Sequence, residues 1–328
     1  ERAHNATLKL QSGDKACTAI WKHIMAVSKA DLKKNYDNLN VSFDLWKGES
    51  DAQPYIPSMV QEMIDKGLAY ESQGAMVVDI QEEGDTKELP PCIVRKSDGA
   101  ALYATSDLAT LVEREKLYQP DAYIYLADKR QELHFTQVFR VAKKAKITRP
   151  EVGLVFIGFG TMNGKDGKPF KTRSGGVMRL EHLIADINEE MFRKITENHE
   201  VDEAEARETA KLVGLSAIKY GDLSNQASKD YVFDLDKFTS FEGNTGPYAQ
   251  YTYARTRSIL RRTDEMPQSG VRITAPEEGQ LALVLSQFPE RVNGAIAEYE
   301  PSIITRYILD VCAAFNRFYH ECPILTAE

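Results

Sequence analysis

The feature that most constrains the fold is an alternation of strand-like and helix-like segments that begins after Pro90 and Pro91. Short apolar runs alternate with longer segments of helical apolar spacing, at residues 100–104, 106–118, 122–126, 131–146 and 152–158. Parallel strands joined by right-handed crossovers bring their carboxyl ends to one edge of a sheet, where doubly wound folds bind ligands. The pattern therefore predicts an α/β protein with a Rossmann-like parallel sheet.

After Arg179 the chain is predicted to be mainly helical, whereas the apolar runs 68–70 and 75–78 predict a hairpin before the α/β region. Helical spacing dominates after Arg179, at 180–196 and 203–219, and no comparable strand pattern follows Tyr248. A length of 328 residues favours two units, each large enough to bury a core. We place the boundary near Gly246, which gives a domain at 1–246 and a helical bundle at 247–328.

Composition excludes several classes of protein. No apolar run approaches the roughly 18 residues that a membrane-spanning helix needs, so we expect a cytoplasmic location. The four cysteines are widely spaced, and no metal site or disulfide framework is predicted. A formal net charge of -8 argues against nonspecific coating of nucleic acid, although a local basic surface could still hold RNA.

A glycine-rich basic loop follows the last predicted strand. It runs from Gly160 to Gly176 and holds four cations, Lys165, Lys168, Lys171 and Arg173. Such a loop can approach phosphates closely, although a solvated basic loop is the simpler alternative. Neither a dinucleotide-binding fingerprint nor a P-loop is present, so a nicotinamide enzyme is excluded.

Five sequence blocks together resemble one family, the arginyl-tRNA synthetases, class I enzymes that join arginine to its tRNA with ATP. The blocks are SDGAALYATSDLA (97–109), RQELHFTQ (130–137), GFGTMNGKDGKPFKTRSGG (158–176), LSNQASKDYVFD (223–234) and FEGNTGPYAQYTYAR (241–255). The resemblance implies that 1–246 is the C-terminal part of a class I catalytic domain with a Lys-Met-Ser-Lys-Ser-like loop. It implies that 247–328 is a truncated α-helical anticodon-binding domain.

The resemblance assigns Tyr103, Asp107 and Gln131 to the arginine pocket. An aspartate carboxylate can accept two parallel N–H bonds from a guanidinium, a geometry that lysine cannot reproduce. Tyr103 would add an aromatic wall and a hydroxyl group. Judged without the resemblance, packing of Tyr103 and helix capping by Asp107 are the commoner roles.

The family pattern also implies an ATP site and a catalytic loop. ATP-binding residues are expected at His134, Gly158, Gly160, Lys171 and Ser174, with ATP accompanied by Mg²⁺. The cations of the loop, Lys168, Lys171 and Arg173, are expected to stabilise the charge that develops on the departing pyrophosphate. For His134 alone, a structural histidine is the commoner case.

For tRNA, the family pattern points to Tyr248, Arg255 and Arg262 in the helical domain. Aromatic faces and cations together suit splayed single-stranded RNA bases. For Tyr248 and Tyr251, core packing is the alternative to contact with RNA. The predicted partners are therefore arginine, ATP and the tRNA for arginine, bound by a monomer.

One element of the family is not found in the sequence. Class I synthetases bind ATP through a His-x-Gly-His element, and none of the six histidines belongs to such a motif. We therefore expect a fragment that lacks the N-terminal part and has little or no activity alone. Two alternatives are a noncatalytic tRNA-binding module and a class I ligase for a different amino acid.

Overall fold

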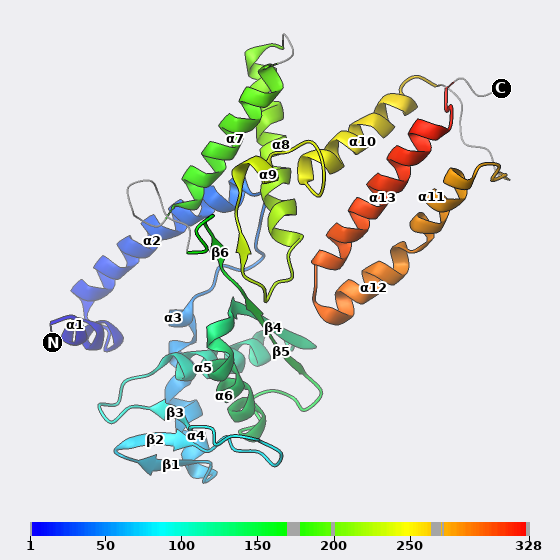
Figure 1. Cartoon of the computed structure of the whole chain (residues 1–328). Helices are drawn as coiled ribbons and strands as arrows, with labels where there is room; N and C mark the ends of the chain where they lie inside the picture. Colours follow the sequence, from blue (N-terminus) through cyan, green and yellow to red (C-terminus); the bar gives the residue numbers. More distant parts are fainter. Residues whose placement is uncertain (1, 169–177, 198–200, 264–269, 271, 326–328) are drawn as a thin grey trace. The chain divides into compact units, whose positions relative to one another are not determined.

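The structure is a computed structural model that describes residues 2–168, 178–197, 201–263, 270 and 272–325 (Figure 1). The chain divides into two compact units. The first unit comprises Glu1–Lys33 and Ser42–Phe159, and the second comprises Lys34–Val41 and Gly160–Glu328. The chain passes from one unit to the other within the long helix α2, shortly after α2 between Val41 and Ser42, and directly after strand β5.

The first unit combines helices with two small sheets. Its elements are α1 (Arg2–Gln11), most of α2 (Lys15–Asn38), α3 (Glu49–Ala52), η1 (Gln53–Tyr55), α4 (Ile56–Asp65), β1 (Ala69–Ser72), β2 (Ala75–Val78), β3 (Cys92–Arg95), α5 (Tyr103–Leu117), β4 (Ala122–Asp128), η2 (Lys129–Gln131), α6 (Glu132–Lys144) and β5 (Gly153–Phe159). Strands β1, β2 and β3 form an antiparallel sheet in that order. Gln73 and Gly74, both with positive φ, form the turn between β1 and β2.

Strands β4 and β5 form the predicted parallel pair. Their register runs from Ala122 opposite Gly153 to Asp128 opposite Phe159. Helix α5 precedes β4, and α6 connects β4 with β5 (Figure 1). Buried apolar side chains from α4, α5, α6 and β3 make one core, which includes Met63, Val94, Leu108, Leu111, Val138 and Val141. The α/β prediction with a parallel sheet is confirmed for this unit.

The predicted strand at 100–104 is wrong. Residues 100–102 belong to no strand, and helix α5 already begins at Tyr103. Leu102 is the extended N-cap, and its N–H donates to the Thr105 hydroxyl, as in a capping box. Of this run only Ala104 is buried and Tyr103 is exposed, so the run is not a core strand, and five apolar residues are too few to distinguish a strand from a helix start.

The second unit is mainly helical. Its elements are β6 (Met162–Asn163), α7 (Leu180–Thr196), α8 (Glu203–Leu223), β7 (Tyr231–Val232), α9 (Leu235–Phe238), α10 (Gly246–Leu260), α11 (Pro276–Ser286), α12 (Phe288–Glu298) and α13 (Ser302–Glu321). Helices α7 and α8 confirm the two helices predicted after Arg179, although α8 is longer than predicted. They share a core that includes Ile187, Met191 and Ala217.

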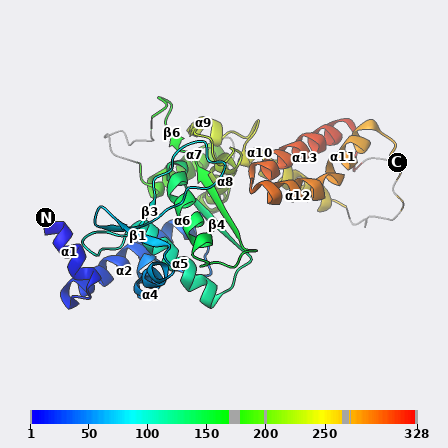
Figure 2. The same cartoon turned by 90° about the horizontal axis from the view of Figure 1, so that it is seen from below.

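Helices α10 to α13 lie together in both views (Figures 1 and 2). Helix α10 begins at Gly246, after Thr245 accepts a capping hydrogen bond from Tyr248 N–H. A side chain at Gly246 would collide with the Ser216 carbonyl of α8, so close helix packing requires glycine there. The predicted domain boundary at 246–247 coincides with this helix start and stays a prediction.

Candidate functional site

One buried threonine ties the amino end of α5 to the neighbouring sheet. The Thr105 hydroxyl accepts a hydrogen bond from Leu102 N–H at 3.1 Å and donates to the carbonyl oxygen of Val94 in β3 at 2.9 Å. A hydroxyl can do both because it carries one donor and two acceptor lone pairs. Thr105 thus holds the first two turns of α5 in place against β3.

Two of the predicted arginine-binding residues lie in these turns. Tyr103 is the first residue of α5 and is 73% exposed, so its ring does not serve the core. Asp107 follows four residues later, which places both side chains on the same helix face. The alternative that Tyr103 packs in the core is therefore wrong, because its ring is exposed.

Asp107 meets His134 across two helices. His134 is the third residue of α6, and its Nε2 lies 2.6 Å from Oδ2 of Asp107. The Asp107 side chain is 27% exposed and the His134 side chain 24%, so water only partly screens the contact between them. A distance this short is typical of a charge-assisted hydrogen bond to a carboxylate. Two residues that were predicted for different ligands, arginine and ATP, thus form one polar pair.

An aromatic wall lies beside this pair. The His134 ring packs edge-on against Phe135, with centroids 5.0 Å apart, and Phe135 stacks on Phe156 of β5 at 5.0 Å. Tyr125 of β4 packs on Phe135 at 4.9 Å. Burial raises the pKa of Tyr125 to about 12; the Arg114 guanidinium opposes this shift and the Asp107 carboxylate adds to it.

Gln131 lies at the turn between β4 and α6. It ends η2, immediately before α6, and is exposed. The preceding Asp128 accepts hydrogen bonds from the backbone N–H and the guanidinium of Arg130, and these bonds lower the pKa of Asp128 to about 2. Asp128 and Arg130 thus satisfy one another and shape the turn that carries Gln131.

The two glycines predicted to bind ATP each have a packing reason to be glycine. A Cβ on Gly158 of β5 would lie 2.8 Å from Cα of Lys129, so β5 and η2 could not approach as they do. Gly160 donates its N–H to the carbonyl oxygen of Ala227 at 2.8 Å, and a Cβ there would collide with the Lys229 carbonyl. Their contact with ATP stays a prediction.

The basic loop is described only in part. Lys171, Arg173 and Ser174 lie outside the described residues. Lys168 is exposed and its backbone N–H donates to Asp166. Lys165 lies 3.1 Å from the Asp234 carboxylate, whose hydrogen bond raises the pKa of Lys165. Sequence reasoning gave Lys165 no separate role, because Asp234 follows almost seventy positions later.

In the helical part, Tyr248 and Arg255 belong to one network. The Arg255 guanidinium lies between the rings of Tyr251 and Tyr319, 4.9 and 4.8 Å from their centroids. It also donates to Asn316 Oδ1 at 2.6 Å, and Asn316 donates to the Tyr248 hydroxyl at 3.0 Å. The tyrosines that enclose Arg255 remain 52% and 40% exposed, so their outer faces are open.

Arg262 is exposed beyond the end of α10, outside this network. Sequence reasoning missed Asn316 and Tyr319, which lie in the block AFNRFYHECPI on α13. The alternation of aromatic and polar side chains in that block was the available signal, but their partners on α10 are more than 60 residues away.

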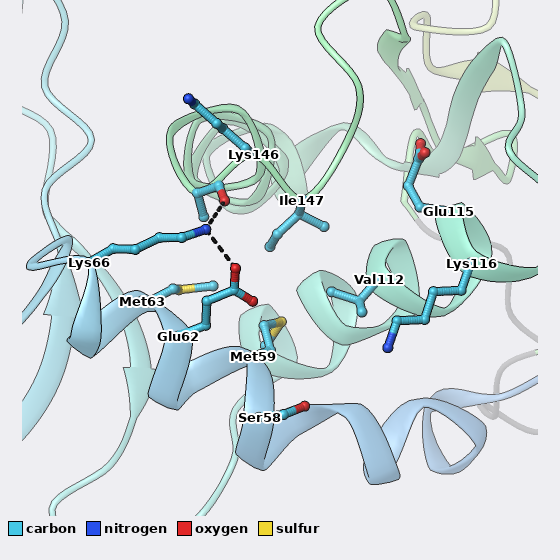
Figure 3. Close-up of a pocket in the computed structure, with 11 residues that line it drawn as sticks. Ser58, Met59, Glu62, Met63, Lys66, Val112, Glu115, Lys116, Lys146 and Ile147 are labelled. Carbon is cyan, nitrogen blue, oxygen red and sulfur yellow. Dashed lines mark hydrogen bonds and ion pairs between the residues drawn. The ribbon is translucent and has the colours of Figure 1, made fainter.

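A separate cavity of about 190 Å³ lies between α4, α5 and the end of α6 (Figure 3). Met59, Met63, Val112 and Ile147 give it apolar walls, and Lys66 crosses its edge to pair with Glu62 at 2.6 Å. Of the residues predicted for arginine or ATP that the structure describes, none lines it. The charged groups at its rim have both signs and select no ligand chemistry.

In the part of the chain that the structure describes, no group of three or more His, Cys, Asp or Glu side chains is arranged to hold a metal ion. No helix among the described residues is both long and apolar enough to cross a membrane.

Two family models match the sequence. The first, for tRNA synthetases class I (R), catalytic domain, matches residues 1–235. The second, for the DALR anticodon binding domain, matches residues 249–328. The parallel pair β4–β5 lies within the first match, and helices α11 to α13 lie within the second.

Curated relatives match the chain along its whole length. An arginine–tRNA ligase of Agathobacter rectalis is 56% identical over 341 residues, covering 100% of this chain and 57% of the relative. One of Alkaliphilus oremlandii is 52% identical over 330 residues, covering 99% of this chain and 56% of the relative. The chain thus spans little more than half the length of these relatives.

Solved structures share the fold. Arginyl-tRNA synthetase of Plasmodium falciparum superposes with a TM-score of 0.85 at 25% identity, covering 98% of this chain and 55% of that one. The Thermus thermophilus enzyme superposes with a TM-score of 0.76 at 21% identity, covering 95% and 61%. The predicted architecture, a class I α/β catalytic portion followed by a helical anticodon-type domain, is confirmed.

Proposed function

Because the chain belongs to the class I arginyl-tRNA synthetases, we propose that it serves arginine–tRNA ligation. In this reaction the arginine carboxylate attacks ATP to give arginyl-adenylate and pyrophosphate, and a hydroxyl of the terminal tRNA ribose then displaces AMP. The observation that carries the proposal is the partly exposed Asp107 carboxylate, presented on α5 beside the parallel pair. Arginine, ATP with Mg²⁺ and the tRNA for arginine are the proposed partners.

We assign arginine recognition to the carboxyl edge of β4 and the start of α5. Asp107 would accept two N–H bonds from the guanidinium, and the exposed Tyr103 ring would cover its plane. Gln131 would add a polar contact from the turn after β4. Lysine carries a point charge with no planar fork, so this set favours arginine.

ATP handling is proposed for the residues around the β5 end and the basic loop. Gly158, Gly160, Lys171 and Ser174 would contact the nucleotide, and the cations of the loop would stabilise departing pyrophosphate. His134, which the family pattern places at the ATP, is bonded to Asp107 instead. Mg²⁺ would enter with the ATP phosphates as part of the substrate. The catalytic cations are proposed to be Lys168, Lys171 and Arg173.

The helical domain is proposed to bind the tRNA. The outer faces of Tyr251 and Tyr319 suit stacking with bases, and Arg255 between them keeps the surface positive. Tyr248 supports this cluster through Asn316, and Arg262 supplies a further exposed cation. We place the functional boundary at 246–247, and we propose a monomer that works in the cytoplasm.

The 328 residues contain no His-x-Gly-His element, so we expect them to form little arginyl-tRNA by themselves. Losing such transition-state contacts costs roughly 10²-fold or more in rate. The test compares this chain with one extended at its amino end by the preceding segment of the Agathobacter rectalis ligase. We expect arginyl-tRNA from the extended chain alone. No product from the extended chain would refute the proposed function, and equal rates would refute the predicted inactivity.

A noncatalytic tRNA-binding module is the second candidate, and the Tyr251–Arg255–Tyr319 cluster favours it equally. Such a module would bind tRNA and show no affinity for arginine. Its tRNA affinity would also survive replacement of Tyr103 and Asp107 by alanine. Calorimetric titration of the chain with arginine, lysine and ATP separates the two candidates, and also tests a class I ligase for another amino acid.

A further inference from the structure

We propose that His134 is a positioning residue that holds the Asp107 carboxylate in the orientation that a guanidinium needs. The inference rests on the proposed function, because it takes Asp107 as the group that meets arginine. It differs from the role that the family pattern implies for His134, which is contact with ATP. The geometry assigns the histidine to the amino-acid side of the site.

The side chains of His134 and Asp107 are in direct contact. His134 Nε2 and Asp107 Oδ2 are 2.6 Å apart, and the two residues come from different helices, 27 positions apart in sequence. Among the described residues, this is the hydrogen bond that the Asp107 side chain makes. A carboxylate that rotates freely loses conformational entropy when it binds a guanidinium. A hydrogen bond that already fixes the carboxylate removes part of this entropic cost.

Neighbouring side chains hold both Asp107 and His134 in place. Thr105 fixes the start of α5 to β3, two positions before Asp107. The His134 ring lies edge-on against Phe135, which itself stacks on Phe156. An imidazole held in this way can act as a fixed hydrogen-bond donor, and site residues gain precision when their supporting side chains are packed.

The Asp107 carboxylate has more acceptor positions than its bond to His134 uses. An ionised carboxylate offers about four lone-pair sites on two oxygens, and a neutral imidazole with its proton on Nε2 uses one of them. Oδ1 and the remaining site on Oδ2 stay available to a bidentate guanidinium. For this arrangement His134 must donate to Asp107 through Nε2.

The test uses two replacements with a matched control. His134→Gln keeps an amide N–H donor at a reach similar to Nε2, whereas His134→Leu removes the donor and keeps an apolar side chain. His182→Leu changes an exposed histidine of α7 outside the proposed site. We expect His134→Leu to weaken arginine binding about tenfold in calorimetry, the equivalent of one hydrogen bond. We expect His134→Gln to recover most of that loss.

ATP binding separates the two roles of His134. If it positions Asp107, ATP affinity in His134→Leu stays within about twofold of the wild type. Unchanged arginine affinity in His134→Leu, or a loss confined to ATP, would overturn the proposal. The control His182→Leu is expected to match the wild type for both ligands.

A second measurement needs no ligand. Nitrogen NMR of the imidazole is expected to show His134 with its proton on Nε2, and Asp107→Ala is expected to shift the resonance of that nitrogen, because its hydrogen bond to the carboxylate is lost. An unchanged imidazole spectrum in Asp107→Ala would overturn the inference by itself. If the wild-type chain bound arginine no better than lysine, the proposed function would fail, and the spectrum would still decide whether His134 orders Asp107.

Discussion

Asp107 and Arg255 are both charged groups held between two helices, but their surroundings differ. Among the described residues, Asp107 has one hydrogen-bond partner, His134, and more than a quarter of its side chain is exposed. Arg255 is bound by Asn316 and Tyr251 and lies between two rings. A charged side chain with one partner keeps hydrogen-bonding capacity for a ligand, whereas one with several partners orders the side chains around it.

The largest effect is expected from removing the charge of Asp107. Asp107→Asn retains the shape but loses the two charge-assisted bonds to a guanidinium, about 3 kcal/mol together, or roughly 100-fold in arginine affinity. Folding stability should change little, because the side chain is partly exposed. Calorimetry measures the affinity, with Asp186→Asn, an exposed acid on α7, as the control. Retained arginine affinity would place the guanidinium elsewhere.

The next effect concerns the buried threonine that orders α5. Thr105→Val keeps the volume but leaves the Val94 carbonyl and the Leu102 N–H without their partner, which costs about 1–3 kcal/mol of unfolding free energy. Urea unfolding measures it. Thr110→Val on the same helix removes only a bond to the Ser106 carbonyl and serves as control. Equal stabilities of the two variants would show that Thr105 does not anchor α5.

A smaller effect is expected where Arg255 is enclosed. Arg255→Lys keeps the charge but loses the planar group between Tyr251 and Tyr319, at a cost of about 1 kcal/mol in unfolding free energy. Affinity for tRNA should fall with it, because the rings lose their common support. Arg262→Lys, at an exposed position, should leave stability unchanged. If Arg262→Lys destabilised the protein more, the ordering role of Arg255 would be wrong.

The smallest effect is expected in how stability depends on pH. It comes from Asp85, whose carboxylate is hydrogen-bonded by the Arg140 guanidinium. The Arg140 guanidinium hydrogen-bonds Asp85 and lowers its pKa from 3.8 to about 2. The folded-state pKa is depressed, so the stabilisation is present above about pH 4 and is lost as the pH falls towards 2. The melting temperature of the wild type should therefore exceed that of Asp85→Asn at pH 5, by a margin that shrinks towards pH 2. A margin independent of pH would contradict the assignment.

Periodicity predicted the elements that are long or regular. The parallel strands β4 and β5 and the helices α6, α7 and α8 follow from their apolar spacing, because the burial of one face repeats over several turns or residues. The supposed strand at 100–104 failed, because capping by Thr105 starts a helix within the same apolar run. Local pattern does not encode which hydrogen bond a buried hydroxyl will make.

In the candidate site, too, the sequence predicted individual residues but not the contacts between them. Motifs identified Asp107 and His134 separately, since each lies in a family block, but no spacing indicates that residues 27 positions apart meet at 2.6 Å. Likewise, Arg255 was predicted from its cation, whereas Tyr319 and Asn316 come from a helix far along the chain. Pairwise geometry between distant segments required the fold.

The central claim is that Asp107 recognises the charge and shape of a guanidinium. The most direct measurement titrates the wild type and Asp107→Asn with arginine and with citrulline, which has nearly the same shape but an uncharged urea group. We predict that the wild type binds arginine at least tenfold more tightly than citrulline, and that Asp107→Asn binds the two about equally, because the preference comes from one charged pair. An arginine preference that persists undiminished in Asp107→Asn would contradict the account.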